Sequence, residues 1–319
     1  MDLANNYPLV SILIPTHERP YFFSLALASA VNQTYPNIEI IISDNSMGDE
    51  TKTIVDDFKR TFENIKYFHT PGLPMWDNWQ KCWDNISDDS QYVNFLMDDD
   101  IFASTKIERM VEQFIQNPEL SLVTSYRMLV DKDGNPIKDK DFNTPPFKEK
   151  VNLVNADEAG SYFLLTGKNW IGEPTTVLFN RSYTDGFFKG WTGDEKYLIL
   201  DYPLWLRLLE KGDMVYINEP LSFFRLHEVN DSKNFTTIVK GSVSMALTIK
   251  NAWNKKKYLN NPKKLHISLL YWIVEATEII GKCYEKDYAG EEFDDLLLVY
   301  KEMCDRYVEA EPAEFVFDI

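Results

Sequence analysis

The first hundred residues alternate between short apolar runs and longer amphipathic or small-residue segments. The apolar runs have the length of buried strands and cover residues 9–15, 38–42, 65–69 and 92–97. The intervening segments have helical spacing or small residues suited to packing on a sheet, and they cover residues 22–31, 51–58 and 76–83. This alternation predicts an α/β fold with a mostly parallel central sheet, flanked by helices and connected by right-handed crossovers.

The fourth apolar run leads directly into three consecutive carboxylates, Asp98, Asp99 and Asp100. Open α/β sheets bind their ligands beyond the carboxyl ends of the strands, which is where these acids are predicted to lie. Adjacent carboxylates repel one another unless a positive charge lies between them, and a hard divalent cation with oxygen ligands is the usual partner. An isolated acidic triplet is more often a solvated turn, but the buried strand in front of this one favours a metal site.

Beyond residue 100 the pattern is less regular. Helices are predicted for residues 104–116 and 201–211, and strands for residues 120–130, 176–179 and 214–217. From about residue 236 onward, apolar stripes at helical spacing dominate. The sequence therefore predicts one α/β domain over residues 1–235 and a C-terminal helical region over residues 236–319.

Composition narrows the choice of function. The net charge of −17 excludes nucleic acid as the main partner, because phosphate binding requires a basic face. The cysteines Cys82, Cys283 and Cys304 lie far apart and form no Cys/His cluster, which argues against zinc and disulfides. The first residues lack the basic and apolar regions of a signal peptide, so we expect a cytoplasmic protein.

One local basic cluster lies within residues Lys250–Lys264 of this acidic chain. A solvated helix face is the favoured interpretation. The alternative is attraction to the anionic inner face of a membrane, or to a lipid-diphosphate acceptor. The oligomeric state cannot be read from the sequence.

Four segments, taken in order, resemble the family 2 glycosyltransferases, whose nucleotide-sugar-binding fold is called GT-A. The family's opening strand and loop are matched by VSILIPTHERP, and its most recognisable block by SLALASAVNQTYPNIEIIISDNSMGDET. Its metal-binding DxD motif is matched by FLMDDD, and its catalytic-base segment by LDYPLWLRLLEKG. The resemblance covers roughly residues 8–232. It implies a nucleotide-binding half over residues 1–100 and an acceptor-binding half over residues 101–235.

The resemblance implies a set of donor-binding residues. Asp44 matches the acid that hydrogen-bonds the nucleobase, and Pro15, Thr16 and Glu18 lie in the loop that wraps the nucleoside. A carboxylate accepts the N3–H of uracil or thymine, which supplies base selectivity, and the donor that we expect is a UDP-sugar. Arg225 matches a basic position near the diphosphate. A turn or helix-cap acid is the alternative interpretation of Asp44.

The resemblance also implies a divalent cation, Mn²⁺ or Mg²⁺. Alignment on the residues around the triplet places Met97 at the first acid of the DxD motif. Asp99 is then the chief metal ligand, Asp100 supports it, and Asp98 reaches the ribose or a metal-bound water. His227 matches a position that contacts the metal or the diphosphate. A register slipped by one would make Asp98 and Asp100 the pair.

Asp201 matches the second acid of the family's Glu-Asp pair, with Leu200 in place of the glutamate. The implied role is a general base that takes the proton from the acceptor hydroxyl as it attacks the anomeric carbon. A helix N-cap is the alternative role for Asp201. Trp170, Glu173 and Thr175 fall where relatives line the acceptor pocket, although a tryptophan in this position also suits a core.

The predicted function is therefore an inverting glycosyltransferase that moves a sugar from a nucleotide-diphosphate donor to a hydroxyl of a glycan or lipid-linked acceptor. One alternative is a sugar-phosphate nucleotidyltransferase, which requires a glycine-rich and basic phosphate loop where this chain has PTHERP. A second alternative is a catalytically silent module that binds nucleotide sugar or glycan. That module would keep Asp44 and the triplet without needing Asp201.

Overall fold

The computed structural model describes residues 7–140, 142–184, 186, 195–197, 201–227 and 234–310. The chain divides into two compact, discontinuous units. Unit 1 comprises Met1–Val154, Trp170–Phe188 and Leu208–Leu226, and unit 2 comprises Asn155–Asn169, Lys189–Arg207 and His227–Ile319. Unit 2 thus joins the C-terminal region to two segments that precede residue 235. The functional halves predicted for residues 1–235 stay a prediction.

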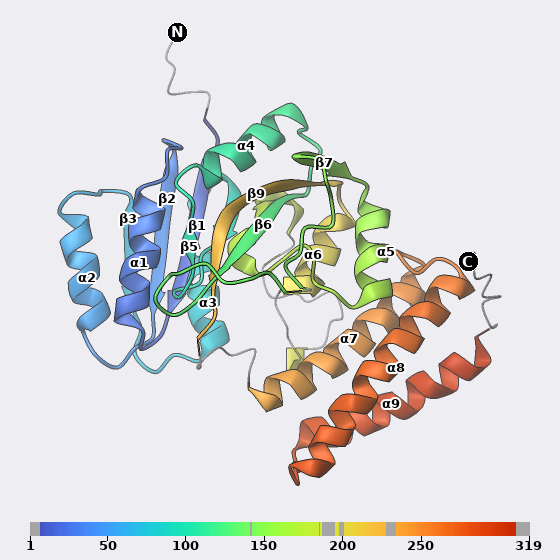
Figure 1. Cartoon of the computed structure of the whole chain (residues 1–319). Coiled ribbons are helices and arrows are strands. Elements are labelled where there is room, and N and C mark those ends of the chain that lie inside the picture. Colours follow the sequence, from blue (N-terminus) through green and yellow to red (C-terminus); the bar gives the residue numbers. More distant parts are fainter. Residues whose placement is uncertain are drawn as a thin grey trace. The chain divides into compact units, whose positions relative to one another are not determined.

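Unit 1 holds a nine-stranded sheet in the order β3-β2-β1-β4-β8-β6-β9-β5, with β7 paired to β9 (Figure 1). Strands β1 to β4 are mutually parallel, whereas β8 runs antiparallel to both β4 and β6. The strands are β1 Leu9–Thr16, β2 Ile38–Asp44, β3 Ile65–His69, β4 Ser90–Phe95, β5 Ile101–Phe102, β6 Leu122–Val130, β7 Val151–Val154, β8 Leu178–Asn180 and β9 Met214–Arg225. The predicted α/β fold is confirmed, and its fully parallel part is the amino-terminal half.

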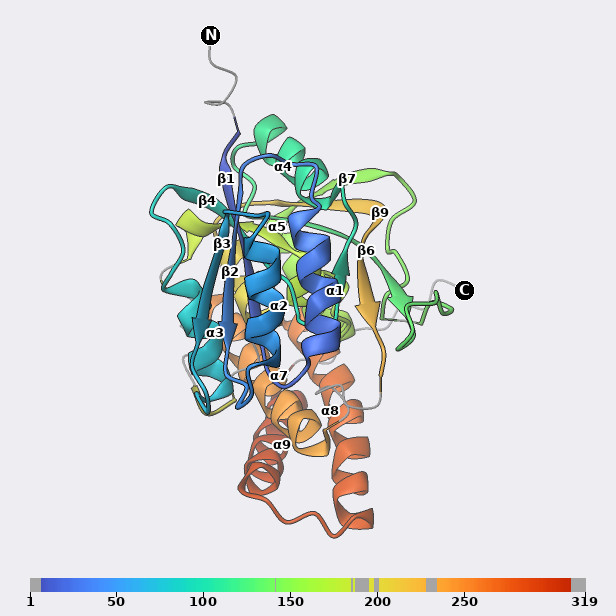
Figure 2. The same cartoon turned by 90° about the vertical axis from the view of Figure 1, so that its left-hand side faces the viewer.

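Helices cover both faces of the parallel strands (Figure 2). In unit 1 they are α1 Pro20–Val31, α2 Glu50–Lys59, α3 Met75–Trp83 and α4 Lys106–Gln116. Ile12 and Ile40 point to one face and share a core cluster with α1 and α4. On the opposite face, Trp79 of α3 packs on Phe95, with ring centroids 5.0 Å apart. Burial on both faces explains why these strands are continuous apolar runs.

Unit 2 is helical, with α5 Ala156–Thr166, α7 Phe235–Lys255, α8 Pro262–Glu285 and α9 Glu291–Glu309. It also contains α6 Asp201–Leu209 up to Arg207. Trp272 of α8 is 1% exposed, and its indole N–H donates to the Ser242 carbonyl of α7 at 2.9 Å. The predicted apolar stripes of the C-terminal region therefore form a core between helices. No helix among the described residues is both long and apolar enough to cross a bilayer.

Helix α5 was not predicted from the sequence, although both of its ends carry recognisable signals. The Asn155 side chain caps the amino end by accepting from the backbone N–H groups of Asp157 and Glu158. Gly167 ends the helix in the left-handed region at φ 63°. Within α5, a Cβ on Gly160 would lie 2.4 Å from the Tyr258 ring. Glycine therefore lets Tyr258 lie against α5 and donate to the Leu206 carbonyl of α6 at 2.6 Å.

Candidate functional site

The carboxyl ends of β1, β2 and β4 bring the predicted donor-site residues of unit 1 together. Thr16 at the end of β1 is in register with Asp44 at the end of β2. The triplet follows β4, and the Thr16 hydroxyl donates to Asp98 Oδ2 at 2.9 Å. The backbone N–H of His17 donates to the same oxygen at 3.2 Å. Pro15 is buried one residue earlier. These two hydrogen bonds therefore join the loop after β1 to the triplet after β4.

A guanidinium group bridges two of the three acids. Arg19 Nη1 lies 3.3 Å from Asp98 Oδ1 and 3.2 Å from Asp99 Oδ2. Burial and the neighbouring Asp99 charge raise the pKa of Asp98 to about 6, against the opposing effects of Arg19, Thr16 and His17. The sequence analysis missed Arg19, although its place just beyond the first strand was a usable signal. The bridge shows that this pair of carboxylates accepts a positive charge between them.

The third acid is buried most deeply and is held by the other half of the sheet. Asp100 is 1% exposed, and it accepts from the Thr175 hydroxyl at 2.6 Å and from the Arg225 backbone N–H at 3.0 Å. Burial and the Asp99 charge raise the pKa of Asp100 well above its usual range. Thr175 also accepts from the Met97 N–H at 3.1 Å. Thr175, predicted as an acceptor residue, therefore orders the triplet, and its predicted sugar contact stays a prediction.

Arg225 ties β9 to the triplet. Its Nε donates to the Asp99 carbonyl at 2.9 Å, and its Nη1 donates to the carbonyls of Asp131 and Lys132 at 3.2 and 3.1 Å. The guanidinium also lies 5.1 Å from the centre of the Phe22 ring, and the residue is 1% exposed. These contacts fix the loop that carries the acids, and the predicted contact with a diphosphate stays a prediction.

Asp44, at the end of β2, has its own hydrogen-bond partners, separate from those of the triplet. The residue is fully buried, its Oδ1 accepts from the Ser46 N–H at 2.9 Å, and its Oδ2 accepts from the Tyr67 hydroxyl at 2.8 Å. Burial and the bond to Asp44 raise the pKa of Tyr67. Tyr67, on the neighbouring strand β3, was not predicted as a site residue. The predicted role of Asp44 toward the nucleobase stays a prediction.

Glu18 links the first loop to the segment after Asp44. It adopts a left-handed backbone conformation at φ 52°, and its N–H donates to Ser46 Oγ at 2.7 Å. Its carboxylate accepts from the Met47 N–H at 2.7 Å. A non-glycine residue in this conformation is uncommon, and the two bonds compensate for its strain. The predicted nucleoside loop is therefore held to both strand ends.

The residues present fit a divalent cation shared with a ligand better than a cation enclosed by protein. Within the described ranges, no three Asp, Glu, His or Cys side chains converge into a complete metal cage. Mg²⁺ commonly uses one or two carboxylates together with waters and substrate phosphates. The triplet supplies hard oxygen ligands, and Asp99 is its most accessible acid at 9% exposure, against 6% for Asp98 and 1% for Asp100. The register with Asp99 as the chief metal ligand stays a prediction.

Of the residues predicted to line the acceptor pocket, Trp170 lies in the interior of unit 1 and Glu173 is half-buried there. Trp170 is 6% exposed and packs on Phe147 and Tyr216, with ring centroids 5.6 and 6.1 Å apart. Glu173 pairs with the buried Arg127 at 2.5 Å. These contacts match the core interpretation of Trp170, and the predicted acceptor contacts of both residues stay predictions.

Asp201 begins helix α6 in unit 2, as predicted, and it is half-buried. The Asn169 side-chain amide donates to Asp201 Oδ2 at 2.7 Å. Both residues line a pocket of about 300 Å³. Asn169 directly precedes Trp170, the first of the three residues predicted to line the acceptor pocket, and was not itself predicted. His227 is partly buried just after β9 and is assigned to unit 2. Its predicted metal contact stays a prediction.

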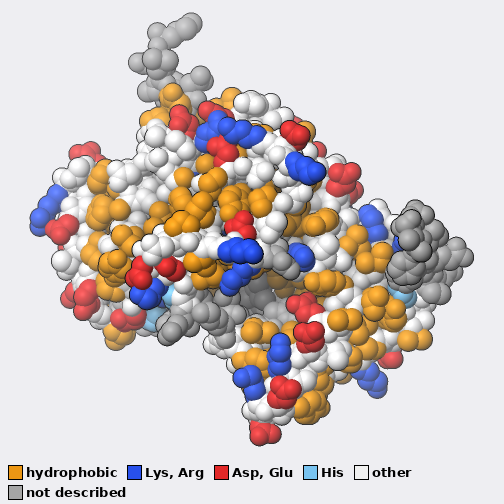
Figure 3. All heavy atoms as spheres, viewed as in Figure 1, with side chains coloured by type: hydrophobic (Ala, Val, Ile, Leu, Met, Phe, Trp, Pro, Cys, Tyr) orange, Lys and Arg blue, Asp and Glu red, His pale blue; other side chains and the backbone are white. Residues whose placement is uncertain are grey.

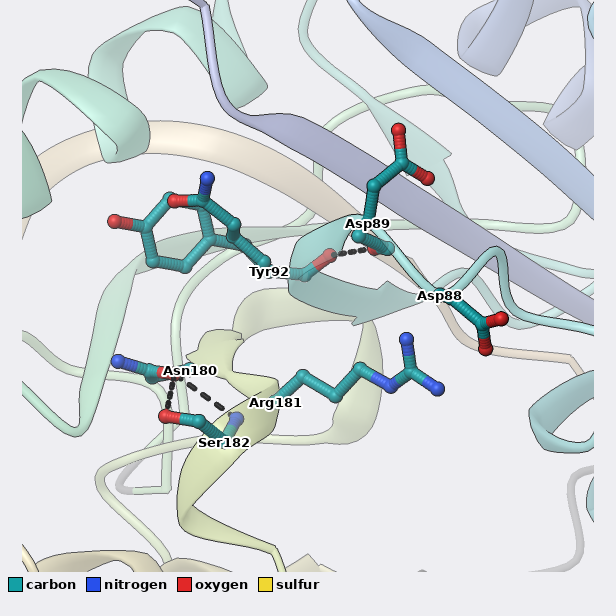
Figure 4. Close-up of a pocket in the computed structure, with 8 residues that line it drawn as sticks. Asp88, Asp89, Tyr92, Asn180, Arg181 and Ser182 are labelled. Carbon is teal, nitrogen blue, oxygen red and sulfur yellow. Dashed lines mark hydrogen bonds between the residues drawn. The ribbon is translucent and has the colours of Figure 1, made fainter.

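A second pocket, of about 450 Å³, lies in unit 1 at the amino end of β4, the end of the strand away from the triplet (Figure 4). Asp88, Asp89 and Tyr92 line it together with Arg181, whose Nη1 donates to the Ser87 carbonyl at 2.6 Å. This pocket adjoins the start of β4, whereas the triplet follows the end of that strand. Ligands of open α/β sheets bind at the carboxyl ends, so the triplet marks the candidate site.

The mixed α/β sheet, with buried acids beyond the end of a central parallel strand, matches the fold of GT-A glycosyltransferases. Residues 11–183 match the family model described as glycosyl transferase family 2. The chain belongs to that family and is a glycosyltransferase. The family and fold predicted from the sequence are confirmed.

The chain is similar to several named proteins. It is 24% identical over 258 residues to the GalNAc(5)-diNAcBac-PP-undecaprenol β-1,3-glucosyltransferase of Campylobacter jejuni, covering 78% of this chain and 77% of that protein. It is 27% identical over 234 residues to the putative teichuronic acid biosynthesis glycosyltransferase TuaG of Bacillus subtilis, covering 72% and 83%. S. aureus TarS 1–349 in complex with UDP-GlcNAc superimposes with a TM-score of 0.64 at 14% identity, covering 95% and 81%. That structure supports the fold.

Proposed function

We propose that this glycosyltransferase moves a sugar, with inversion, from a UDP-sugar to a hydroxyl of a glycan or lipid-linked acceptor, using Mn²⁺ or Mg²⁺. The observation that carries the proposal is the pair Asp98 and Asp99, buried side by side and bridged by Arg19 at 3.3 and 3.2 Å. A negative diphosphate cannot approach three carboxylates without added positive charge. The names of the two bacterial relatives, one acting on an undecaprenol-linked glycan, support this acceptor class.

Each residue of the site has a defined task in the proposal. Asp99 holds the cation, which when bound neutralises the charge that grows on the departing diphosphate. Asp98 orders the first loop through Thr16 and His17, and Asp100 anchors the triplet to Thr175. Asp44 selects the base.

In unit 2, Asp201 takes the proton from the acceptor hydroxyl. Asn169 donates to one of its oxygens and thereby orients the carboxylate. A carboxylate is a suitable general base only if it reaches the hydroxyl in a defined orientation.

A thermal-shift screen tests the donor. UDP-, GDP- and TDP-sugars are added with Mg²⁺, with Mn²⁺, or with chelator. A ligand that binds the folded state raises the melting temperature according to the ratio of its concentration to its dissociation constant. We expect UDP-sugars to stabilise the protein only when the cation is present. Because uracil and thymine both present an N3–H, stabilisation by UDP- and TDP-sugars no greater than that by GDP-sugars would remove the role of Asp44, and stabilisation in chelator would remove the metal.

Product analysis separates the rival activities. A glycosyltransferase releases UDP from a UDP-sugar, whereas a nucleotidyltransferase consumes or releases pyrophosphate. A silent binding module would show the thermal shift with neither product. Release of UDP that depends on both metal and acceptor is the result that the proposal requires.

Attraction of the basic cluster to a membrane's inner face is a weaker part of the proposal, because several of its lysines have partners inside unit 2. Lys250 pairs with Glu302 at 2.8 Å, Lys257 pairs with Asp157 at 2.7 Å, and Lys264 donates to Ser161 at 2.9 Å. Figure 3 shows basic, acidic and apolar side chains interspersed on the face in view. Co-sedimentation with anionic but not neutral vesicles, lost at high salt, is the test.

A further inference from the structure

The pocket beside Asp201 is built from four helices of unit 2 and the segment after α5. Its lining includes Phe163 of α5, Asp201 and Tyr202 of α6, Met245 of α7 and Glu275 of α8. With a volume of about 300 Å³, it lies at the lower end of the range for small-ligand sites. Helices α7 and α8 therefore contribute to the same cavity as the proposed base.

Tyr202 forms one side of the pocket and is held by two contacts. Tyr202 is 8% exposed, stacks on Phe163 with ring centroids 5.2 Å apart, and donates to the Gly241 carbonyl at 3.3 Å. The Ser242 hydroxyl in the wall is buried and has no hydrogen-bond partner within the described ranges. Unpaired buried hydroxyls are uncommon in folded proteins. One side of the cavity is thus aromatic, and its wall holds the Ser242 hydroxyl, which can form a hydrogen bond to a ligand.

The charges of the lining discriminate between ligand classes. The described lining has two carboxylates, Asp201 and Glu275, and the amide of Asn169, but no lysine or arginine. Glu275 is an exposed residue at the edge of the pocket, and partial burial together with the neighbouring Glu278 raises its pKa. A phosphate or a uronic acid placed here would be repelled by both carboxylates. Hydroxyl groups, by contrast, donate to carboxylates, and the face of a sugar ring packs on apolar side chains.

We propose that this pocket binds an uncharged sugar of the acceptor, with one of its hydroxyls directed at Asp201 and another at Glu275. The proposal rests on the proposed function, in which Asp201 is the base, and it adds the chemical class of the accepting residue. It also gives helices α7 and α8 a role in acceptor specificity. Any phosphate or acidic group of the acceptor then lies outside this pocket.

Methyl NMR of the full chain tests the proposal, with Met245 as the reporter in the pocket and Met97, beside the triplet, as the reporter for the donor. The probes are the methyl β-glycosides of glucose, galactose and N-acetylglucosamine, compared with methyl β-glucuronide. We expect at least one neutral glycoside to shift the Met245 signal and the glucuronide to leave it unchanged. UDP-sugar with Mg²⁺ should shift Met97.

Two matched substitutions locate the binding. Ile238 lines the pocket and is 39% exposed, so Ile238→Trp fills the cavity from its edge. Leu298→Trp places the same side chain on α9, at a position that is 70% exposed and outside the lining. The first should weaken glycoside binding at least tenfold, and the second should leave it within twofold. Glu275→Gln, which retains the side-chain shape, should weaken binding about tenfold, the scale of one hydrogen bond to a charged group.

The outcomes separate this inference from the proposed function. If Met97 responds to UDP-sugar but no neutral glycoside shifts Met245, the sugar pocket is wrong and the proposed function stands. If a neutral glycoside shifts Met245 but no nucleotide sugar shifts Met97, the pocket binds sugar and the proposed function is wrong. Equal binding of the glucuronide, or equal loss in Ile238→Trp and Leu298→Trp, would also overturn the inference.

Discussion

Glu39 and Asp98 are both buried carboxylates of the sheet in unit 1, each 6% exposed, but their surroundings differ. Glu39 accepts from Ser11 Oγ at 2.6 Å and from the N–H and hydroxyl of Ser87 at 2.9 and 2.7 Å, and it pairs with Lys66 at 2.7 Å. Burial alone would raise the pKa of Glu39, but these donors lower it. Asp98 also accepts hydrogen bonds, but the burial of Asp98 and the charge of the adjacent Asp99 raise the pKa of Asp98 to about 6.

From this difference we expect Glu39 to stabilise the fold and the triplet to be available to a ligand. A buried carboxylate with a full set of donors and its own lysine is at its most stable when ionised. In the triplet, Asp98 and Asp99 share the single guanidinium of Arg19. Asp100, directly beside them, is held by the Thr175 hydroxyl and the Arg225 N–H. We therefore expect ionisation of the triplet to weaken the ligand-free fold. Proteins tolerate such strain at functional sites because a bound cation relieves it.

The largest expected effect concerns a third carboxylate, Asp201 in unit 2, which our proposal assigns to chemistry rather than to folding. Asp201→Asn retains the size and the capping ability of aspartate but cannot take the hydroxyl proton. Removing a general base costs a factor of about 10²–10⁴ in rate. We expect that loss in steady-state turnover, with donor affinity and melting temperature nearly unchanged. A large fall in melting temperature instead would make the helix cap its main role.

The next largest effect separates the two groups of buried acids directly. Asp99→Asn should abolish metal-dependent binding of UDP-sugar in calorimetry, a loss of at least about 100-fold, or roughly 2.7 kcal/mol. Glu39→Gln, the matched control at a buried acid outside the site, should leave donor affinity unchanged. Greater damage from Asp100→Asn than from Asp99→Asn would show that the metal register is slipped by one.

The same two substitutions should change the free energy of unfolding in opposite directions. Glu39→Gln removes a charged acceptor from Lys66, Ser11 and Ser87, so the free energy of unfolding should fall by roughly 1.5–3 kcal/mol in urea titrations. Asp99→Asn in chelator should raise it, because one repelling charge is gone. If Asp99→Asn destabilised the metal-free protein as much as Glu39→Gln does, the triplet would be a structural network instead.

The smallest effects are in the pH dependence of the metal-free protein. The folded pKa of Asp98, about 6, exceeds its ordinary value of 3.8, so its contribution to stability is lost as the pH rises between these values. Glu39 has a lowered folded pKa, so its stabilisation is present above 4.5 and is lost as the pH falls through the folded value.

Unfolding measured from pH 3 to pH 8 in chelator checks both signs. Asp98→Asn should reduce the decline above pH 4, and the remaining decline comes from Asp100, whose pKa is also raised. Glu39→Gln should flatten the loss below pH 4. Added Mg²⁺ should restore stability on the high-pH side alone, because the cation binds the ionised triplet. A profile that Asp98→Asn leaves unchanged would contradict the assignment.

The sequence by itself determined the parallel half of the sheet, the family, and the place of the triplet. These features depend on local periodicity and on short motifs, so the strands predicted at 38–42 and 65–69 match β2 and β3 closely. The second half was predicted less well. Its strands are short or mixed in direction, and α5 has little periodicity between its clear caps.

Only the tertiary structure decided which side chains meet. Arg19 reaches acids 79 and 80 residues away, and Asn169 reaches Asp201 across 32 residues. Tyr67, on the neighbouring strand β3, donates to Asp44 and is also distant from it in sequence. Contacts between segments distant in sequence depend on packing that local pattern does not encode. The sequence therefore identified the acids of the site, whereas the fold determined the partners that set their charge and orientation.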